Sequence, residues 1–178
     1  MKKYIHYKIV DFRIESLIQT ITALDNSIKF LKNKITKLDY YDGGWFLEES
    51  EPIYGLAFIA LQNYINSSIF DLDENLGSKI QHYQSDEKVL NSNQSRIQLI
   101  ISIANYFKHR DDDSPLHRGT SQVLDDLNLT YSDSIEIENL PIFKGLQLLS
   151  KNYNLMDLVK ITKNWREKIW NEKEWDNH

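Results

Sequence analysis

A polar stripe runs along one predicted helix in the middle of the chain and ends at a histidine. Its members recur every three or four positions in an otherwise apolar segment: Gln98, Ser102, Asn105 and His109. Side chains with this spacing share one face of an α-helix. Because an imidazole titrates near neutral pH and is a common general acid or base, His109 is the leading catalytic candidate. The alternative is that the stripe is a solvated helix face ending in ordinary capping residues.

The residues around this histidine resemble the signature of the HEPN superfamily. The match is the segment Asn105-Tyr106-Phe107-Lys108-His109 near the end of a late helix, and the resemblance extends from Ile53 to Arg110. It implies an all-α fold of the kind common in bacterial toxin–antitoxin and anti-phage systems. In active members it also implies metal-independent RNA cleavage, with His109 as the family's histidine and Asn105 at its polar position.

The arginine that active HEPN proteins carry before the histidine has no counterpart here. The corresponding positions hold Ser102, Ile103 and Ala104. Arg110 follows the histidine and could replace that cation only if the helix end frays. Losing a group that stabilises the charge of the transition state costs about a hundredfold or more in rate. The sequence therefore favours a binding module, and the ribonuclease alternative would use His109 with Asn105 and Arg110.

Imidazoles and carboxylates follow the stripe within a short segment. They are His109, Asp111, Asp112, Asp113 and His117. Such a set could ligate a divalent ion. It lacks the glycine-punctuated spacing of a calcium loop and the i,i+4 histidine pair of a helical zinc site. We therefore expect a solvated acidic loop, with no metal and no cofactor.

The overall charge points to a basic partner. The chain has 26 acidic and 21 basic side chains and a net charge of -5, which disfavours non-specific binding to nucleic acid. Acidic patches can mimic phosphates and cover the basic active site of a nuclease. We expect the partner surface to contain Glu48, Glu49, Glu51, Asp111, Asp112 and Asp113, with Trp170 and Trp175, which lie off the apolar stripe of the last helix. The alternatives are an ordinary soluble surface and tryptophans that fold over their own helix.

Apolar residues that recur every three or four positions predict the helices that would position these groups. The clearest seam is Ile14, Leu17, Ile21, Leu24, Ile28, Leu31, Ile35 and Leu38. Its period of about 3.5 residues is that of near-parallel helix packing. We interpret it as a helix of an intramolecular bundle, and a dimeric coiled coil is the alternative. The segment Asp39-Tyr40-Tyr41-Asp42-Gly43-Gly44 should end this helix.

The remaining pattern predicts an all-α, single-domain bundle of four long and two short helices over residues 1–178. Further helices are expected at 50–72, where Ser50-Glu51-Pro52 is typical of a helix start, at 94–109, at 120–129, at 141–149 and after Asn154. Residues 73–93 should form a loop or short helix, and Ser134–Glu138 could form one short strand. The expected core includes Ile21, Leu24, Ile28, Leu56, Ala60, Ile97, Ile101 and Leu146.

Composition excludes several classes of protein. The chain has no cysteine, so it has no disulfide framework and no thiolate site. No apolar run approaches the roughly 20 residues of a membrane span, and the first residues lack the apolar core of a signal peptide. We expect a cytoplasmic protein with no membrane partner. The abundance of Lys, Ile and Asn fits an AT-rich bacterial gene.

Three hypotheses for function follow. The first is a non-enzymatic, acidic immunity or antitoxin protein that blocks the basic active site of a toxic nuclease. The second is a divergent HEPN-type ribonuclease that uses His109, the only hypothesis in which RNA is a partner. The third is a structural or regulatory homodimer.

Overall fold

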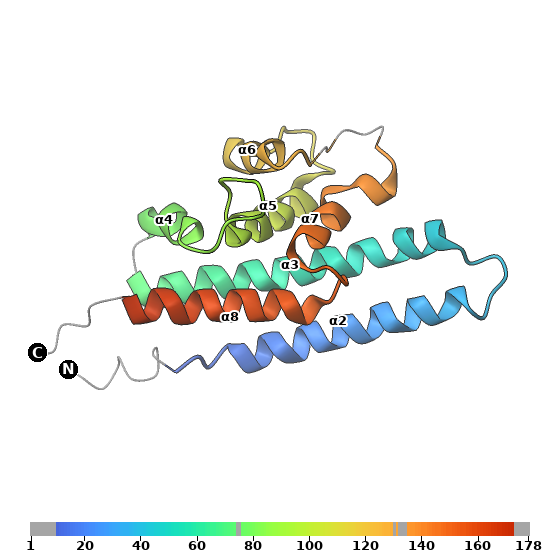
Figure 1. Ribbon diagram of the computed structural model, residues 1–178, viewed down its shortest axis with the longest axis horizontal. Coiled ribbons are helices and arrows are strands. Elements are labelled where there is room, and N and C mark those ends of the chain that lie inside the picture. Colours follow the sequence, from blue (N-terminus) through green and yellow to red (C-terminus); the bar gives the residue numbers. More distant parts are fainter. Residues whose placement is uncertain (1–9, 74–75, 130, 132–134, 173–178) are drawn as a thin grey trace, which may run out of the picture.

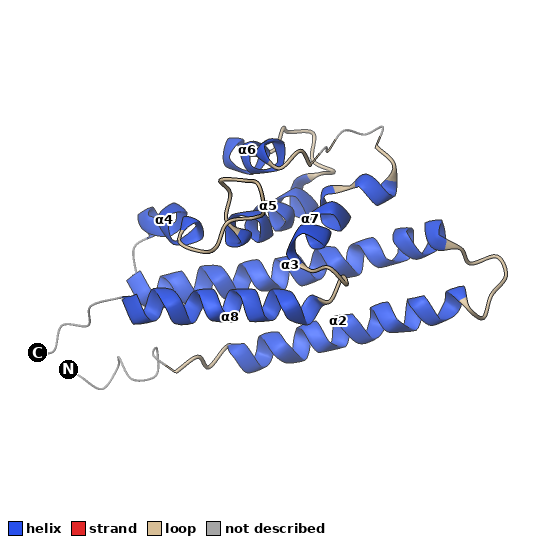
Figure 2. Cartoon of the chain, in the orientation of Figure 1, coloured by secondary structure: helices blue, strands red, loops and turns tan. Residues whose placement is uncertain are grey.

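The computed structural model describes residues 10–73, 76–129, 131 and 135–172. Across these ranges the chain is all-α and contains no strand, which confirms the predicted fold class (Figure 1, Figure 2). The elements are α2 (Ile14–Ile35), α3 (Gly43–Asp73), η1 (Leu76–Ser78), α4 (Lys79–Gln84), α5 (Arg96–His109), α6 (Arg118–Asp126), η2 (Ile137–Asn139), α7 (Pro141–Leu149) and α8 (Leu155–Glu172). The expected four long helices are α2, α3, α5 and α8.

Helices α2 and α3 form an antiparallel pair. Lys34 near the end of α2 bonds to Glu49 near the start of α3, and Arg13 just before α2 pairs with Asp71 near the end of α3. Helix α8 lies beside both, while α5, α6 and α7 form a second group over α3 (Figure 1). Helix α3 therefore lies between two sets of helices, α2 with α8 and α5 with α6 and α7. It contacts α5, the helix that carries His109.

The apolar seam of α2 packs within the chain. Its residues Leu17, Ile21, Ile28 and Leu31 are buried among side chains of the common core. These four side chains are covered within the chain, as the intramolecular interpretation of the seam predicts. The end of the seam is not covered to the same extent, since Ile35 is exposed.

Helix α3 begins at Gly43, well before the predicted start near Ser50. The Asp42 side chain accepts a hydrogen bond of 3.0 Å from the backbone N–H of Trp45, which is the bond of an N-cap. The residues expected to end the first helix therefore also start the second. Pro52 lies inside α3 instead of at its first turn. Glu48, whose carbonyl Pro52 leaves without its helical donor, is exposed, so water can satisfy that carbonyl.

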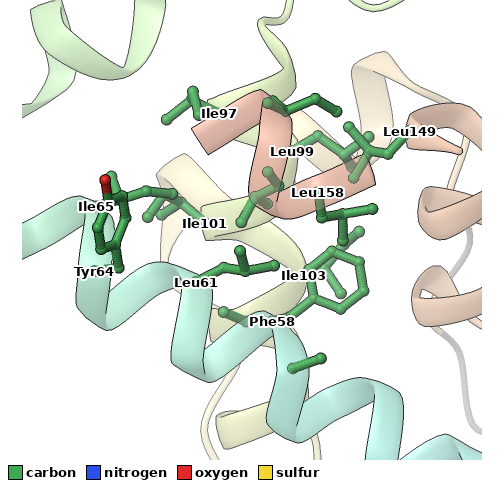
Figure 3. Close-up of a cluster of buried hydrophobic side chains, with 14 of the residues drawn as sticks. Phe58, Leu61, Tyr64, Ile65, Ile97, Leu99, Ile101, Ile103, Leu149 and Leu158 are labelled. Atoms are coloured by element: carbon green, nitrogen blue, oxygen red, sulfur yellow. The ribbon is translucent and has the colours of Figure 1, made fainter. Parts of the chain in front are cut away.

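The core is centred on α3, α5, α7 and α8 (Figure 3). Its most enclosed side chains include Phe58, Leu61, Ile65, Ile97, Leu99 and Ile103. Of the residues predicted as core, Ile21, Ile28, Ile97, Ile101 and Leu146 are buried, and Leu24 and Ala60 are half-buried. The prediction for Leu56 is wrong: this side chain is 51% exposed. Helix α3 has neighbours on most of its circumference, and Leu56 lies on the strip that no described element covers.

The shorter segments agree in part with the prediction. Residues 73–93 contain the short α4, Asn154 accepts the N–H of Met156 at the start of α8, and Pro141 opens α7. The expected strand at Ser134–Glu138 does not form in its described part: Ile135 and Glu136 are irregular, and Ile137 begins η2. In the described ranges, no helix combines the length and apolar character needed to cross a bilayer.

Gly55 tests how tightly α3 packs against α5. A Cβ added at Gly55 would enter the ring of Phe107, whereas one added at Gly43 meets nothing within 4 Å. Alanine is the better helix former by about 1 kcal/mol, so any net loss reports the clash. We expect Gly55→Ala to lower the free energy of unfolding by about 1–3 kcal/mol in urea titrations. Gly43→Ala is the matched control and should not lower it, because the added Cβ meets nothing there. Equal effects of the two substitutions would refute this packing.

Candidate functional site

Helix α5 places His109 at its C-terminal end, in the part of the molecule formed by α5, α6 and α7. Its start is fixed by a capping box in which Ser95 accepts the N–H of Gln98 and the Gln98 side chain accepts the N–H of Ser95. His109 is the last residue of the helix and Arg110 is its C-cap. Two members of the predicted polar stripe are therefore structural, because Gln98 belongs to the cap and Ser102 is buried.

Asn105 is held by two neighbouring helices. Gln62 of α3 donates a hydrogen bond of 2.7 Å to its Oδ1 atom, and its Nδ2 atom donates one of 3.2 Å to the Thr120 hydroxyl on α6. Both ends of the amide are thus engaged by the protein. The expected assistance of His109 by Asn105 gains no geometric support, since Asn105 does not line the cavity beside the histidine.

His109 pairs with a carboxylate of the loop that follows it. The Nδ1 atom lies 2.8 Å from Oδ2 of Asp112, and both side chains are more than half exposed, at 55% and 56%. A carboxylate on one ring nitrogen fixes the orientation and tautomer of an imidazole.

The guanidinium of Arg110 is turned towards a buried acid. It forms an ion pair with Glu51 of α3, and its Nε atom lies 3.6 Å from Oδ2 of Asp111. It also lies over the ring of Phe107, with Cζ 5.0 Å from the centroid. The charge of Arg110 is therefore compensated by Glu51.

A cavity of about 500 Å³ opens beside these residues. Its walls come from the end of α5, the loop after it, α6 and the segment before α7: Tyr106, His109, Arg110, Asp111, Ser114, Pro115, Leu116, Ser121, Tyr131, Ile135 and Leu140. Burial raises the pKa of Tyr131, and the carboxylate of Asp125, to which Tyr131 is hydrogen-bonded, raises it further. Tyr131 is therefore protonated and neutral at physiological pH.

The predicted acidic surface divides into structural and exposed members. Glu49 bonds to the Lys34 ammonium at 2.6 Å and accepts the Tyr41 hydroxyl at 2.8 Å. The Lys34 bond, followed by that of Tyr41, lowers the pKa of Glu49, while burial and Glu49 raise the pKa of Tyr41 to about 12. Glu49 thus joins α2 to α3.

Glu51 does not belong to an accessible surface, which corrects that prediction. It is 7% exposed and is committed to Arg110. The exposed acids of the predicted set are Glu48, Asp111, Asp112 and Asp113.

The expectation of an exposed tryptophan is wrong for Trp170. The residue is 5% exposed, and the guanidinium of Arg166 lies over its ring at 4.4 Å from the centroid. Helix α8 contacts α2, α3 and α5, so its buried face is wider than the single stripe read from the sequence. Trp175 lies outside the described residues.

No group of three or more His, Asp or Glu side chains in the described ranges is arranged to hold a metal ion. In the loop after α5, Asp112 pairs with His109, while the side chains of Asp111 and Asp113 are exposed.

Sequence reasoning missed the tyrosines of the cavity. Tyr106 lies three positions before His109 and so shares its face of the helix, a spacing that could have identified it. Tyr131 and Ser121 reach the cavity from later segments. No periodicity in the sequence connects those segments to α5.

Comparison with known proteins identifies no relative. No family model matches the chain, and neither does any curated protein or solved structure. The HEPN resemblance therefore stays a prediction, and the function has to be argued from the site itself.

Proposed function

We propose that this chain is a non-enzymatic binding protein that holds a basic protein partner through the acidic loop at the end of α5, as an immunity or antitoxin protein holds a toxic nuclease. The observation that carries the proposal is the row of consecutive exposed carboxylates Asp111, Asp112 and Asp113. They follow directly after a helix C-terminus, where the helix dipole disfavours negative charge.

The position of these acids is unfavourable for the free protein. Each carboxylate near a helix C-terminus costs about 0.3–1 kcal/mol at low ionic strength, and neighbouring like charges add to that cost. The hydrogen bond of Asp112 with His109 offsets part of this cost, and Asp111 lies near Arg110. Local rules are most often broken where function requires it. A basic partner would relieve the repulsion that the free chain carries.

The ion pairs of Glu49 and Glu51 leave fewer acidic residues free to form the partner surface. Glu49 and Glu51 are committed to Lys34 and Arg110, so a partner cannot use them without breaking contacts between helices. The loop 111–113 is the part of the predicted acidic set that remains both exposed and continuous.

A ribonuclease of the HEPN type is the second candidate. It is favoured by the cavity that brings His109, Arg110 and Tyr106 to one place. The Asp112 carboxylate would orient the imidazole for proton transfer. It is weakened by the ion pair of Arg110 with Glu51, because RNA cleavage needs a cation directed at the developing phosphorane charge.

The first prediction from the proposal concerns stability. We expect the double variant Asp111→Asn/Asp113→Asn to raise the free energy of unfolding by roughly 0.3–1 kcal/mol in low-salt buffer. The gain should vanish in 1 M salt, where the Debye length falls to about 3 Å. Glu48→Gln, an exposed acid near the start of α3, is the control and should give no gain. A loss of stability in the double variant would contradict the view that these acids are kept for binding.

Binding is tested by co-purification. The tagged chain would be co-expressed with the products of the adjacent reading frames in its source. We expect it to retain a basic protein at low salt and to release it at 1 M salt, where exposed charges are screened. The variant Asp111→Asn/Asp112→Asn/Asp113→Asn should lose that protein, while Asp39→Asn in the connection between α2 and α3 should keep it. Retention of no protein at low salt, or equal retention by the triple variant, would reject the proposal.

Nuclease activity is tested on tRNA and mRNA. We expect no cleavage by the purified wild-type chain above that of His109→Ala. Cleavage that drops by about a hundredfold or more in His109→Ala would replace the binding proposal with the second candidate.

A further inference from the structure

The cavity at the end of α5 has acidic surroundings despite the two basic side chains in its wall. Arg110 is neutralised by Glu51, and His109 is paired with Asp112. Asp111 also lines the cavity, and its side chain is 89% exposed. Asp125 is hydrogen-bonded to Tyr131. Among the described residues of the wall, the basic side chains are thus paired with carboxylates, and Asp111 presents an exposed carboxylate to a ligand.

The same cavity offers aromatic and apolar surface. Tyr106 and Tyr131 line it together with Leu116, Ile135 and Leu140. Aromatic rings attract cations placed over their faces, and a guanidinium also stacks on them through its plane. Tyr106 is only 5% exposed, so the half-buried Tyr131 and the Asp111 carboxylate are the groups with which a planar cation in this cavity would interact.

We propose that this cavity receives an arginine side chain from the basic partner. The guanidinium would lie against the tyrosine-lined wall and pair with the Asp111 carboxylate at the rim. The inference rests on the proposed function and specifies the chemistry by which the partner is recognised. A central anchor in a pocket, rather than the whole contact area, carries most of the binding energy of a protein interface, and arginine is one of the residues enriched at such positions.

Arginine fits better than the other basic or anionic groups. Lysine carries a compact, strongly hydrated charge that loses more on leaving water, whereas guanidinium is weakly hydrated and pairs with carboxylates in a bidentate manner. A phosphate would meet a guanidinium that is already paired, with Asp111 beside it. The volume of about 500 Å³ accommodates an arginine side chain with part of its flanking backbone.

The test uses a small probe, so it does not depend on knowing the partner. The full-length chain, labelled with ¹⁵N, would be titrated with N-acetyl-arginine amide at low salt. We expect saturable shifts of the amides at His109, Asp111, Ser114 and Ser121. The uncharged isostere N-acetyl-citrulline amide should bind at least about tenfold more weakly, because it loses the cation while keeping the shape.

Three results would overturn the inference. They are no saturable shifts at the cavity residues, equal affinity for the citrulline compound, or shifts at these residues caused by inorganic phosphate in place of the arginine compound. The last result would favour an anion site of the kind that an RNA-cleaving protein needs.

A variant that fills the cavity provides a second test of the arginine receptor. Ser114 is exposed at the rim, so Ser114→Trp should block the cavity without disturbing the core. We expect it to abolish the arginine shifts. Gln147→Trp is the matched control, because Gln147 is exposed at a second cavity of about 500 Å³ between α7 and the residues that follow α6. It should leave the shifts unchanged, and the opposite pattern would overturn the inference.

The two proposals fail in different ways. Loss of partner retention in the aspartate variants, without any probe binding, would keep the binding function and reject the arginine receptor. Probe binding with no retained partner would support the receptor chemistry and reject the proposed function.

Discussion

Glu51 and Arg110 form the ion pair on which the character of the site depends. Glu51 lies on α3 and is almost fully buried, and Arg110 caps α5, so the pair joins the two helix groups at the end where His109 is presented. Removing one partner of a buried pair typically costs about 3–5 kcal/mol, because the other charge is left without compensation. The pair therefore joins α3 to the end of α5 and compensates the positive charge of Arg110.

The same pair links the cavity to the loop that follows. The charge of Arg110 is already compensated by Glu51. The contact of the Arg110 Nε atom with Asp111, at 3.6 Å, is therefore only a weak second interaction. Asp111 therefore keeps its negative charge towards solvent, and Asp112 orients His109. The Asp111 carboxylate at the cavity opening and the tyrosines in its wall are the groups on which the proposed binding of a cation depends.

The sequence predicted the helices and caps that local spacing determines, but not the burial of side chains that depends on contacts between distant helices. The seam of α2, the proline start of α7 and the asparagine cap of α8 are local signals, and they correspond to real elements. The start of α3 was missed because Asp42-Gly43-Gly44 is typical of a helix end, while Asp42 serves here as a cap. The burial of Glu51 and Trp170 depends on partners far along the chain, and no spacing rule predicts which helix will cover a given face.

The positions where the resembling family carries its arginine are packed inside this fold. Ser102, Ile103 and Ala104 are at most 3% exposed, so each is part of the packed interior of α5. An arginine there would place an unpaired guanidinium in the core, which costs several kcal/mol unless a carboxylate accompanies it. The nearby buried carboxylate, Glu51, is already paired with Arg110. The guanidinium next to His109 in the sequence, that of Arg110, is instead paired with Glu51, and the acidic neighbour of His109 is Asp112.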